Sequence, residues 1–317
     1  MQDSRARLLL PVIIPSAILA VSTASIFIRF TQAEGAPSLV IAAVRLTIAT
    51  LLLAPFALTN YLDEIKRFTR TEILLGAFSG IFLAVHFATW ISSLEYTNVA
   101  SSAVFVSTGP LWVALLAPLL LKERLTKTAI LGLILALVGG AVIGLSDACV
   151  WESGLICTDI QNILQGRSMW GNILALIGAL AVSGYLIIGR RLRNAGNMSL
   201  IPYIFLVYGM AAVTLNVIMF ASGHSPFGYS PKIYGLIFLL AAIPQLIGHS
   251  TFNWLLKFLP ATFVAVTTLS EPIGSAILAY FILNETPTSF VIIGGCILLI
   301  GIYLTSREEN NTSKESK

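Results

Sequence analysis

Charged residues are scarce in this chain of 317 residues: Asp, Glu, Lys and Arg make up only 11% of it, against about 25% in an average soluble domain. Hydrophobic residues make up 56%, and the mean hydropathy is +0.87. A water-soluble fold of this size has no interior large enough for so much apolar surface. The composition therefore excludes a soluble protein and makes a lipid bilayer the natural solvent.

Several chemical signatures are also missing from the sequence. It has no GxxxxGK[ST] loop, so direct use of ATP by this chain is excluded. It has no His-rich metal set and no pair of intramembrane carboxylates, which a membrane enzyme would need. It has no sizeable polar domain of the kind a receptor or scaffold would carry, although a receptor, scaffold or membrane enzyme remains the alternative interpretation. No cofactor and no metal are expected.

Cysteine is rare, with three residues in all. Cys296 lies in an apolar run, whereas Cys149 and Cys157 share one polar loop. A disulfide between these two and a pair of free thiols are both open interpretations.

What the sequence does contain is a series of long apolar runs. A helix needs about 20 apolar residues to cross the hydrocarbon, and the runs are too continuous for the alternating strands of a membrane barrel. We therefore predict an all-α integral membrane protein of ten transmembrane helices: Leu8–Ile28, Ser38–Leu58, Thr71–Ser92, Val99–Leu121, Thr128–Leu145, Met169–Gly189, Ser199–Ala221, Ile233–Leu255, Thr262–Leu283 and Thr288–Thr305. We interpret the first run as a retained helix rather than a signal peptide, because its apolar core is long.

The positive charges have a consistent place among these spans. With ten spans both termini lie on one side, and most of the 19 lysines and arginines fall on loops of that side. Arg29, Arg167 and Lys232 lie on the other side, and Arg45 lies inside a span. The positive-inside rule then predicts an inner (plasma) membrane protein with both termini in the cytoplasm. This distribution explains the net charge of +4 without a nucleic-acid partner.

The chain also repeats itself. A shift of 162 residues brings a proline, a glutamate and two glycines into register, namely Pro110 with Pro272, Glu123 with Glu285, Gly132 with Gly294 and Gly139 with Gly301. The segment "LAVS" at Leu19–Ser22 likewise recurs at Leu180–Ser183. We predict a five-helix repeat at 1–146, an extracytoplasmic loop at 147–167, a second repeat at 168–305 and a disordered cytoplasmic tail at 306–317.

Because five is an odd number, the two copies would cross the membrane in opposite directions. Inverted repeats are typical of secondary transporters, which hold substrate near the midplane where the repeats meet. Between Ser107 and Lys127 the sequence reads "STGPLWVALLAPLLLKERLTK", and between Thr268 and Thr288 it reads "TLSEPIGSAILAYFILNETPT".

These paired motifs resemble the EamA-type transporters of the drug/metabolite transporter superfamily, over Leu8–Thr305. The resemblance implies alternating-access movement of amino acids, other small metabolites or drugs. It also implies a cavity lined largely by the third, fourth, eighth and ninth helices. The first repeat has "TGP" where the second has "SEP", so any role of the acid is asymmetric.

That acid, Glu271, lies about three turns into its span, by the helical rise of about 1.5 Å per residue. A charge there costs at least ~2.5–3.5 kcal/mol, so it is expected to face a cavity, to be paired or to be protonated. Coupling to protons and contact with a substrate cation are the functional interpretations. The structural ones are a pair with Arg45 or capping of carbonyls loosened by Pro272. Arg45 itself either binds a substrate carboxylate, reaches outward or holds a helix contact.

His86 and His249 lie at nearly equivalent positions, and each is followed by a polar or aromatic residue four positions later on the same face. Each histidine either lines the cavity or makes an interhelical hydrogen bond. The predicted substrate-binding set is His86, Trp90, Ser107, Gln245, His249, Asn253, Thr267 and Glu271. Trp112 and Tyr280 either add an aromatic wall or pack.

The remaining motif residues have structural interpretations. Glu123 and Glu285 are expected to cap the helix that follows each of them, and Pro110 and Pro272 to break their helices near the midplane. Repeated glycines in the fifth and tenth spans predict close helix packing within a monomer or across a homodimer. We therefore predict an exporter of a small organic metabolite, such as an amino acid.

Overall fold

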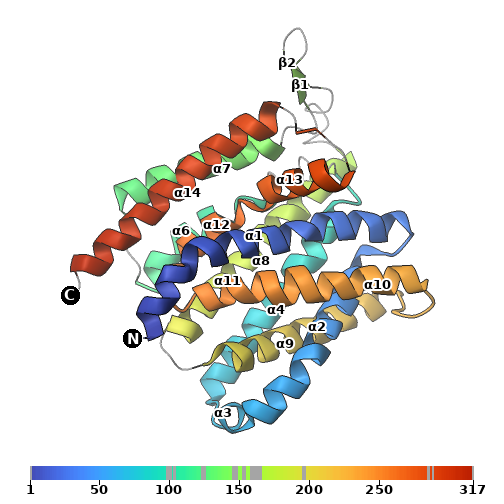
Figure 1. Ribbon diagram of the computed structural model, residues 1–317. Coiled ribbons are helices and arrows are strands. Elements are labelled where there is room, and N and C mark those ends of the chain that lie inside the picture. Colours follow the sequence, from blue (N-terminus) through green and yellow to red (C-terminus); the bar gives the residue numbers. More distant parts are fainter. Residues whose placement is uncertain are drawn as a thin grey trace.

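The computed structural model describes residues 2–97, 102, 105–122, 126–144, 149–151, 155–157, 166–194, 198–283, 286–287 and 289–315. Within these ranges only the backbone is described for 2–8, for 306–315 and for a few single residues, including Cys149, Cys157 and Pro272. This part of the chain is a helical bundle with one short hairpin (Figure 1).

Each of the ten expected spans corresponds to apolar helix. Seven are long helices, two of them built from several elements: α1 (Gln2–Ala33), α2 (Ser38–Asn60), α4 (Arg70–Ser93), α8 (Gly166–Asn194), α9 (Leu200–Ala221), α10 (Pro231–Leu240) with η3 (Ala241–His249) and α11 (Ser250–Leu255), and α12 (Ala261–Thr268) with α13 (Glu271–Leu283). The other three have shorter apolar parts: α6 (Gly109–Leu120), α7 (Lys127–Gly144) and α14 (Ser289–Glu315), which is apolar over Ser289–Thr305. The prediction of a ten-helix membrane fold is confirmed.

Local sequence signals fix where the helices begin. Thr69 caps α4, since its hydroxyl accepts from the Glu72 backbone N–H while the Glu72 carboxylate accepts from the Thr69 N–H, at 2.8 Å. The short helix α3 (Leu62–Lys66) holds the start of α9, because its Glu64 carboxylate accepts a 2.6 Å bond from the Ser199 N–H. Ser230 caps α10 in the same way as Thr69 caps α4, directly before Pro231.

The fourth and ninth spans each contain a turn directly before a proline. Ser107 and Thr108 form the turn before α6, and Leu269 and Ser270 separate α12 from α13. The Thr108 N–H donates to the Phe105 carbonyl at 3.2 Å, and the Ser270 N–H donates to the Thr267 carbonyl at 3.1 Å. Both bonds join residues three positions apart, and they lie at positions that correspond in the two halves. Each proline then enters the new helix near its first position, where its missing N–H costs nothing.

The fifth and tenth spans, α7 and α14, lie side by side (Figure 1). A methyl group added at Gly132 would lie 2.7 Å from the Gly301 carbonyl oxygen, and one at Gly139 would lie 2.6 Å from that of Gly294. The beginning of α7 therefore meets the end of α14 and the reverse, so the two helices pack antiparallel with their backbones in contact. The sequence predicted that these glycines allow close packing either within a monomer or across a homodimer. The contact between α7 and α14 is packing within one chain.

The two ends of the bundle differ. Both termini lie at one end, and the hairpin of β1 (Cys149–Trp151) and β2 (Leu155–Cys157) projects from the other (Figure 1). The hairpin is antiparallel, with Cys149 opposite Cys157. The backbone of α14 continues to Glu315, so here the structure differs from the disordered tail predicted at 306–317. The tail residues prolong the last helix, and several of them, including arginine, glutamate and lysine, have good helix propensity.

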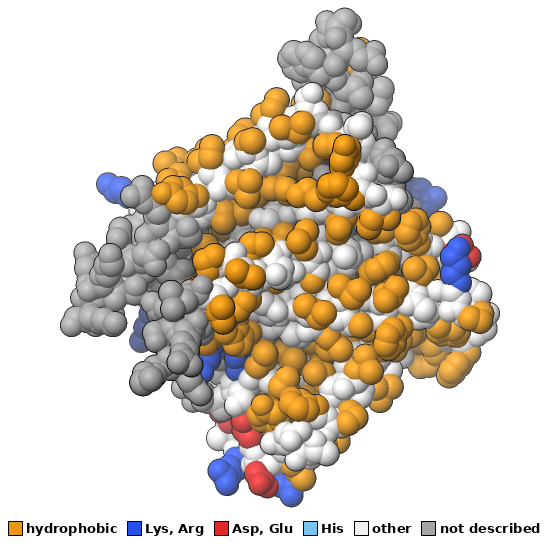
Figure 2. All heavy atoms as spheres, viewed as in Figure 1, with side chains coloured by type: hydrophobic (Ala, Val, Ile, Leu, Met, Phe, Trp, Pro, Cys, Tyr) orange, Lys and Arg blue, Asp and Glu red, His pale blue; other side chains and the backbone are white. Residues whose placement is uncertain are grey.

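The outer surface of the bundle is apolar. Large exposed hydrophobic side chains lie along the helices, and they cover much of the face seen in Figure 2, while its charged side chains gather towards the edges. Glu34, directly after α1, and Lys232, at the start of α10, form an exposed ion pair of 2.6 Å. A surface of this kind is suited to lipid along its middle and to water at its ends.

Candidate functional site

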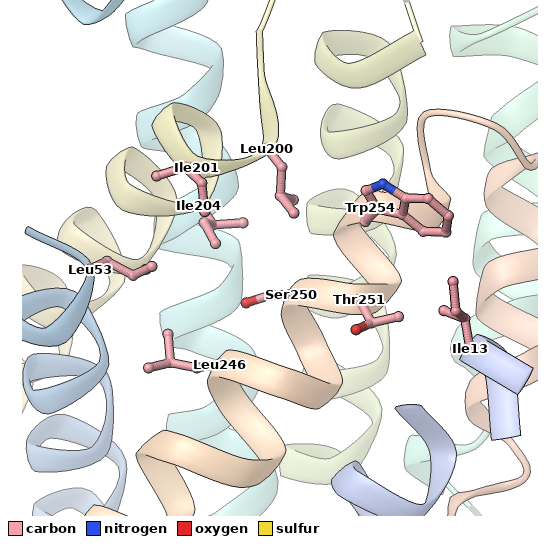
Figure 3. Close-up of a pocket in the computed structure, with 9 residues that line it drawn as sticks. All are labelled: Ile13, Leu53, Leu200, Ile201, Ile204, Leu246, Ser250, Thr251 and Trp254. Carbon is pink, nitrogen blue, oxygen red and sulfur yellow. The ribbon is translucent and has the colours of Figure 1, made fainter. Parts of the chain in front are cut away.

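A pocket of about 360 Å³ lies between the two halves of the chain (Figure 3). Its walls come from α1 and α2 of the first half and from α9, η3 and α11 of the second. They are mostly apolar and consist of Ile13, Leu53, Leu200, Ile201, Ile204, Leu246, Ser250, Thr251 and Trp254. Leu200 begins α9 and Trp254 lies near the end of α11, so this pocket is on the side of the membrane that carries the termini.

Ser250 connects this apolar pocket to a buried polar network. Its hydroxyl lies 3.2 Å from the Tyr208 hydroxyl and donates to the Gln245 carbonyl at 3.3 Å. Asn253, one turn further along, donates its amide N–H to the hydroxyls of Tyr185 and Tyr208. The network thus joins α8, α9, η3 and α11 in the interior of the bundle.

Two amides in this network keep unused hydrogen-bonding capacity. Gln245 is fully buried, and among the described residues neither its amide nitrogen nor its amide oxygen has a partner. The Asn253 amide oxygen is also buried without a partner there. Buried polar groups are nearly always hydrogen-bonded, so such groups point to a ligand or to a change of conformation.

An aromatic cluster lies beside this network. His86 stacks on Trp90 of the same helix with 5.8 Å between ring centroids. Phe87 meets the edge of His249 at 5.5 Å, which joins α4 to η3. His86 lies 2.9 Å through its Nδ1 from the Gly178 carbonyl oxygen of α8. The two expectations for the histidines, cavity wall and interhelical hydrogen bond, therefore both have a physical basis at His86.

Arg45 of α2 also contacts Phe87. Its side chain is 1% exposed, and its guanidinium carbon lies 4.5 Å from the centroid of the Phe87 ring. None of its three side-chain nitrogens has a hydrogen-bond partner within the described part of the chain. Arg45 and Glu271 interact electrostatically without a hydrogen bond between them.

Glu271 is half-buried at the first position of α13, directly after the break in the ninth span. Its backbone carbonyl accepts a 2.9 Å bond from the Ser22 hydroxyl. The Ser183 hydroxyl donates in the same way to the carbonyl of Gly109, at 2.9 Å. Gly109 corresponds to Glu271 under the 162-residue shift. Equivalent serines therefore donate to the backbone carbonyls at both helix breaks.

The other predicted site residues are less closely connected to this centre. Thr267 is buried and its hydroxyl bonds to its own helix at Phe263. Ser107 is half-buried in the turn before α6. Trp112 donates to the Thr108 hydroxyl at 3.2 Å, and Tyr280 is 48% exposed on the outer face, so Tyr280 adds no wall to the site. Glu123 and Glu285 lie outside the described residues.

The residues that sequence reasoning missed are Tyr185, Tyr208 and Phe87. All three are buried and contact predicted site residues. The available signal was a tyrosine near the middle of a span, away from the membrane interface where tyrosine is usual. Phe87 had no signal of its own beyond its place next to His86.

Comparison with known proteins agrees with this arrangement. The model of the EamA-like transporter family matches the chain twice, at residues 11–145 and 169–307. The chain belongs to the EamA-like transporter family. Each match covers one of the two five-helix halves expected from the internal repeat, and the resemblance found in the sequence is confirmed.

Relatives of this EamA-like protein are named as transporters. One uncharacterized transporter of Archaeoglobus fulgidus is 25% identical over 93% of this chain and 95% of its own length. A second from that organism is 24% identical over 74% of this chain and 75% of its own. A chloroplastic WAT1-related protein of Arabidopsis thaliana is 26% identical over 69% of this chain and 51% of its own. A solved crystal structure superposes with a TM-score of 0.74 at 18% identity, over 95% of this chain and 97% of its own, which shows the shared fold.

Proposed function

We propose that this EamA-like protein is a secondary transporter that moves a small organic metabolite, an amino acid or a similar amphiphile, out across the inner membrane by alternating access. The observation that carries the proposal is the exchanged pair of serine bonds, Ser22 to Glu271 and Ser183 to Gly109. Each bond ties the first span of one half to the broken span of the other half.

The glycine contacts support an inverted relation between the halves. Gly132 meets Gly301, and Gly139 meets Gly294, while the repeat makes Gly132 equivalent to Gly294 and Gly139 to Gly301. Exchanging the halves therefore converts one contact into the other, as a two-fold axis between antiparallel helices requires. Inverted repeats allow inward-open and outward-open states to form from the same two conformations exchanged between the halves.

The pocket and the polar centre support a route for a solute. The pocket of Figure 3 begins near the end of the bundle that carries the termini, and Ser250 connects it to Gln245 and Tyr208 in the interior. Apolar walls with a few convergent polar groups are the usual composition of a small-molecule site. With the termini in the cytoplasm, as the charge distribution favours, this is the side from which an exported solute enters.

Glu271 is the proposed coupling residue. It lies half-buried within the ninth span, and the buried cation Arg45 interacts with it electrostatically. The other titratable side chains around Arg45 are His86, His249 and Tyr208. Proton uptake at Glu271 would change the net charge of this centre and thereby the affinity for a charged solute.

The experiment is counterflow in proteoliposomes preloaded with each common amino acid, comparing wild type with Glu271→Gln at two pH values. We expect the wild type to exchange at least one amino acid, and the variant to lose either uptake or the pH dependence of uptake. An exposed acid offers the matched control, since Glu34→Gln makes the same change at the end of the bundle. Normal exchange by Glu271→Gln would remove Glu271 from the mechanism. Absence of exchange with amino acids and with a wider metabolite panel would contradict the transporter proposal.

A further inference from the structure

Arg45 is a buried cation whose guanidinium has no hydrogen-bond partner among the described residues. A guanidinium keeps its charge in proteins and has five N–H donors in a fixed plane. Here it is 1% exposed, and the described residues offer no acceptor to any of its three nitrogens. Two other buried arginines are hydrogen-bonded: Arg190 donates to the Leu256 carbonyl at 2.8 Å, and Arg193 donates to that of Met198 at 2.7 Å.

The surroundings of Arg45 compensate its burial only in part. Its guanidinium carbon lies 4.5 Å from the centroid of the Phe87 ring, which is a cation–π contact. Such a contact offers no acceptor to the N–H groups, and a buried charge without a hydrogen-bonded partner is costly. Glu271 acts on Arg45 through its charge but accepts no hydrogen bond from it. The N–H donors of the guanidinium therefore remain to be satisfied by a group that is not part of these side chains.

Gln245 has unused donors on a neighbouring helix. The Phe87 ring connects the two helices, because it contacts the Arg45 guanidinium of α2 and the edge of the His249 ring of η3, the element that carries Gln245. The helices α2 and η3, which carry Arg45 and Gln245, are in contact. Gln245 is fully buried and its amide N–H₂ group has no acceptor within the described chain.

We infer that Arg45 and Gln245 form a subsite for the carboxylate of the transported solute, an inference that rests on the proposed function. The guanidinium fork matches the two oxygens of a carboxylate, and the Gln245 amide offers a further donor. The rings of Phe87 and His249 adjoin this place, so the subsite fits a carboxylate with an apolar or aromatic body. The Asn253 amide oxygen and the Glu271 carboxylate are acceptors for hydrogen-bond donor groups of the same solute.

Thermal unfolding of the purified full chain in detergent tests this inference. The probes are phenylacetate and phenylethanol, which share an aromatic body and differ in the carboxylate, at constant ionic strength. A ligand that binds the folded state raises its stability in proportion to ln(1 + [L]/Kd). We expect phenylacetate to raise the unfolding midpoint saturably, and phenylethanol to have little effect.

The variants are Arg45→Lys, which keeps the charge and loses the fork, and Gln245→Leu. Each is expected to weaken phenylacetate binding, by about tenfold or more for Arg45→Lys, because a point charge does not replace bidentate geometry. Arg29→Lys is the matched control at an exposed position and should bind like wild type. If Arg45→Lys does not fold, Gln245→Leu carries the test.

The outcomes separate this inference from the proposed function. No saturable effect of phenylacetate on wild type, or an equal effect on wild type and both site variants, overturns the carboxylate subsite. Counterflow that exchanges carboxylate-bearing amphiphiles equally in wild type and Arg45→Lys also overturns it, while transport stands. Arg45-dependent binding of phenylacetate in a protein that exchanges no solute supports the subsite and contradicts transport.

Discussion

The hydroxyl of Ser22 in the first span donates a 2.9 Å hydrogen bond to the backbone carbonyl of Glu271 in the ninth. Ser183 in the sixth span makes the same bond, also of 2.9 Å, to Gly109 in the fourth. Ser22 and Ser183 end the two copies of "LAVS", and Gly109 and Glu271 each precede the proline of their own half. One interaction therefore occurs twice, at the two helix breaks, with the halves exchanged.

The first prediction is that Ser22→Ala and Ser183→Ala have matching effects. Each removes one hydrogen bond at a break, so each should lower the free energy of unfolding by about 0.5–1.5 kcal/mol. The thermal unfolding midpoint of the purified protein measures this. Ser16→Ala is the control, because Ser16 is exposed and its hydroxyl donates to the Val12 carbonyl of its own helix. A loss in one variant with none in the other would contradict the equivalence of the two breaks.

The second prediction concerns two glycines that differ in their surroundings. A methyl group at Gly139 would lie 2.5 Å from the Leu298 backbone nitrogen, so Gly139→Ala must push α7 away from α14. Overpacking of this kind costs about 1–3 kcal/mol. Gly235 has no atom within 4 Å of an added methyl group, so Gly235→Ala should instead stabilise α10 by about 0.5–1 kcal/mol.

The measurement is again the unfolding midpoint, which should fall for Gly139→Ala and stay level or rise for Gly235→Ala. Gly301→Ala provides a second test, since its methyl group would lie 2.5 Å from the Ala136 backbone nitrogen in the same pair of helices. If Gly139→Ala and Gly301→Ala were as stable as Gly235→Ala, the close antiparallel contact of α7 and α14 would be wrong.

The ten-helix architecture could be predicted from the sequence because it depends on one strong and local property. Each span must be apolar over its whole length, and polar loops separate the spans, so hydropathy alone places them. The repeated glycines and prolines were visible for the same reason, since their positions are fixed by backbone geometry. The shift that aligns Pro110 with Pro272 therefore also predicted which glycines are equivalent in the two halves.

The side-chain partners of the site could not be predicted in the same way. Tyr208, Ser250 and Asn253 come from three elements whose relative rotation depends on packing along their whole length. The π-helix η3 adds to this, because its wider turn changes which face of the eighth span carries Gln245 and His249. Helical periodicity placed His249 and Asn253 on one face, but it gave no indication of Tyr185 on another helix.

The third prediction separates the two histidines. His86 lies 2.9 Å from the Gly178 carbonyl, so His86→Phe keeps the ring and removes an interhelical hydrogen bond. Such bonds contribute about 0.6 kcal/mol on average in membrane proteins, so the unfolding midpoint should fall slightly. The His249 side chain contacts the Phe87 ring through its edge, a contact that a phenyl ring can also make, so His249→Phe should leave the midpoint unchanged and reduce counterflow instead. A midpoint that falls more for His249→Phe than for His86→Phe would contradict this assignment.

The last prediction concerns Cys149 and Cys157, which the backbone of the hairpin places directly opposite each other. Opposite residues of antiparallel strands have Cα atoms about 4.5–5.5 Å apart, which lies within the range of about 4.4–6.8 Å that disulfides require. If the hairpin faces an oxidising exterior, opposite the termini, the two thiols should be oxidised to a disulfide.

Thiol-specific mass tagging of the unfolded protein, with and without prior reduction, measures this directly. We expect one tag before reduction, on Cys296, which is free and exposed, and three after it. Cys149→Ser removes the pair, so that variant should carry two tags under both conditions. Three tags on wild type without reductant, in protein purified under non-reducing conditions, would show free thiols. That result would also remove one argument for placing the hairpin outside the cell, because a cytoplasmic loop with the same register is kept reduced.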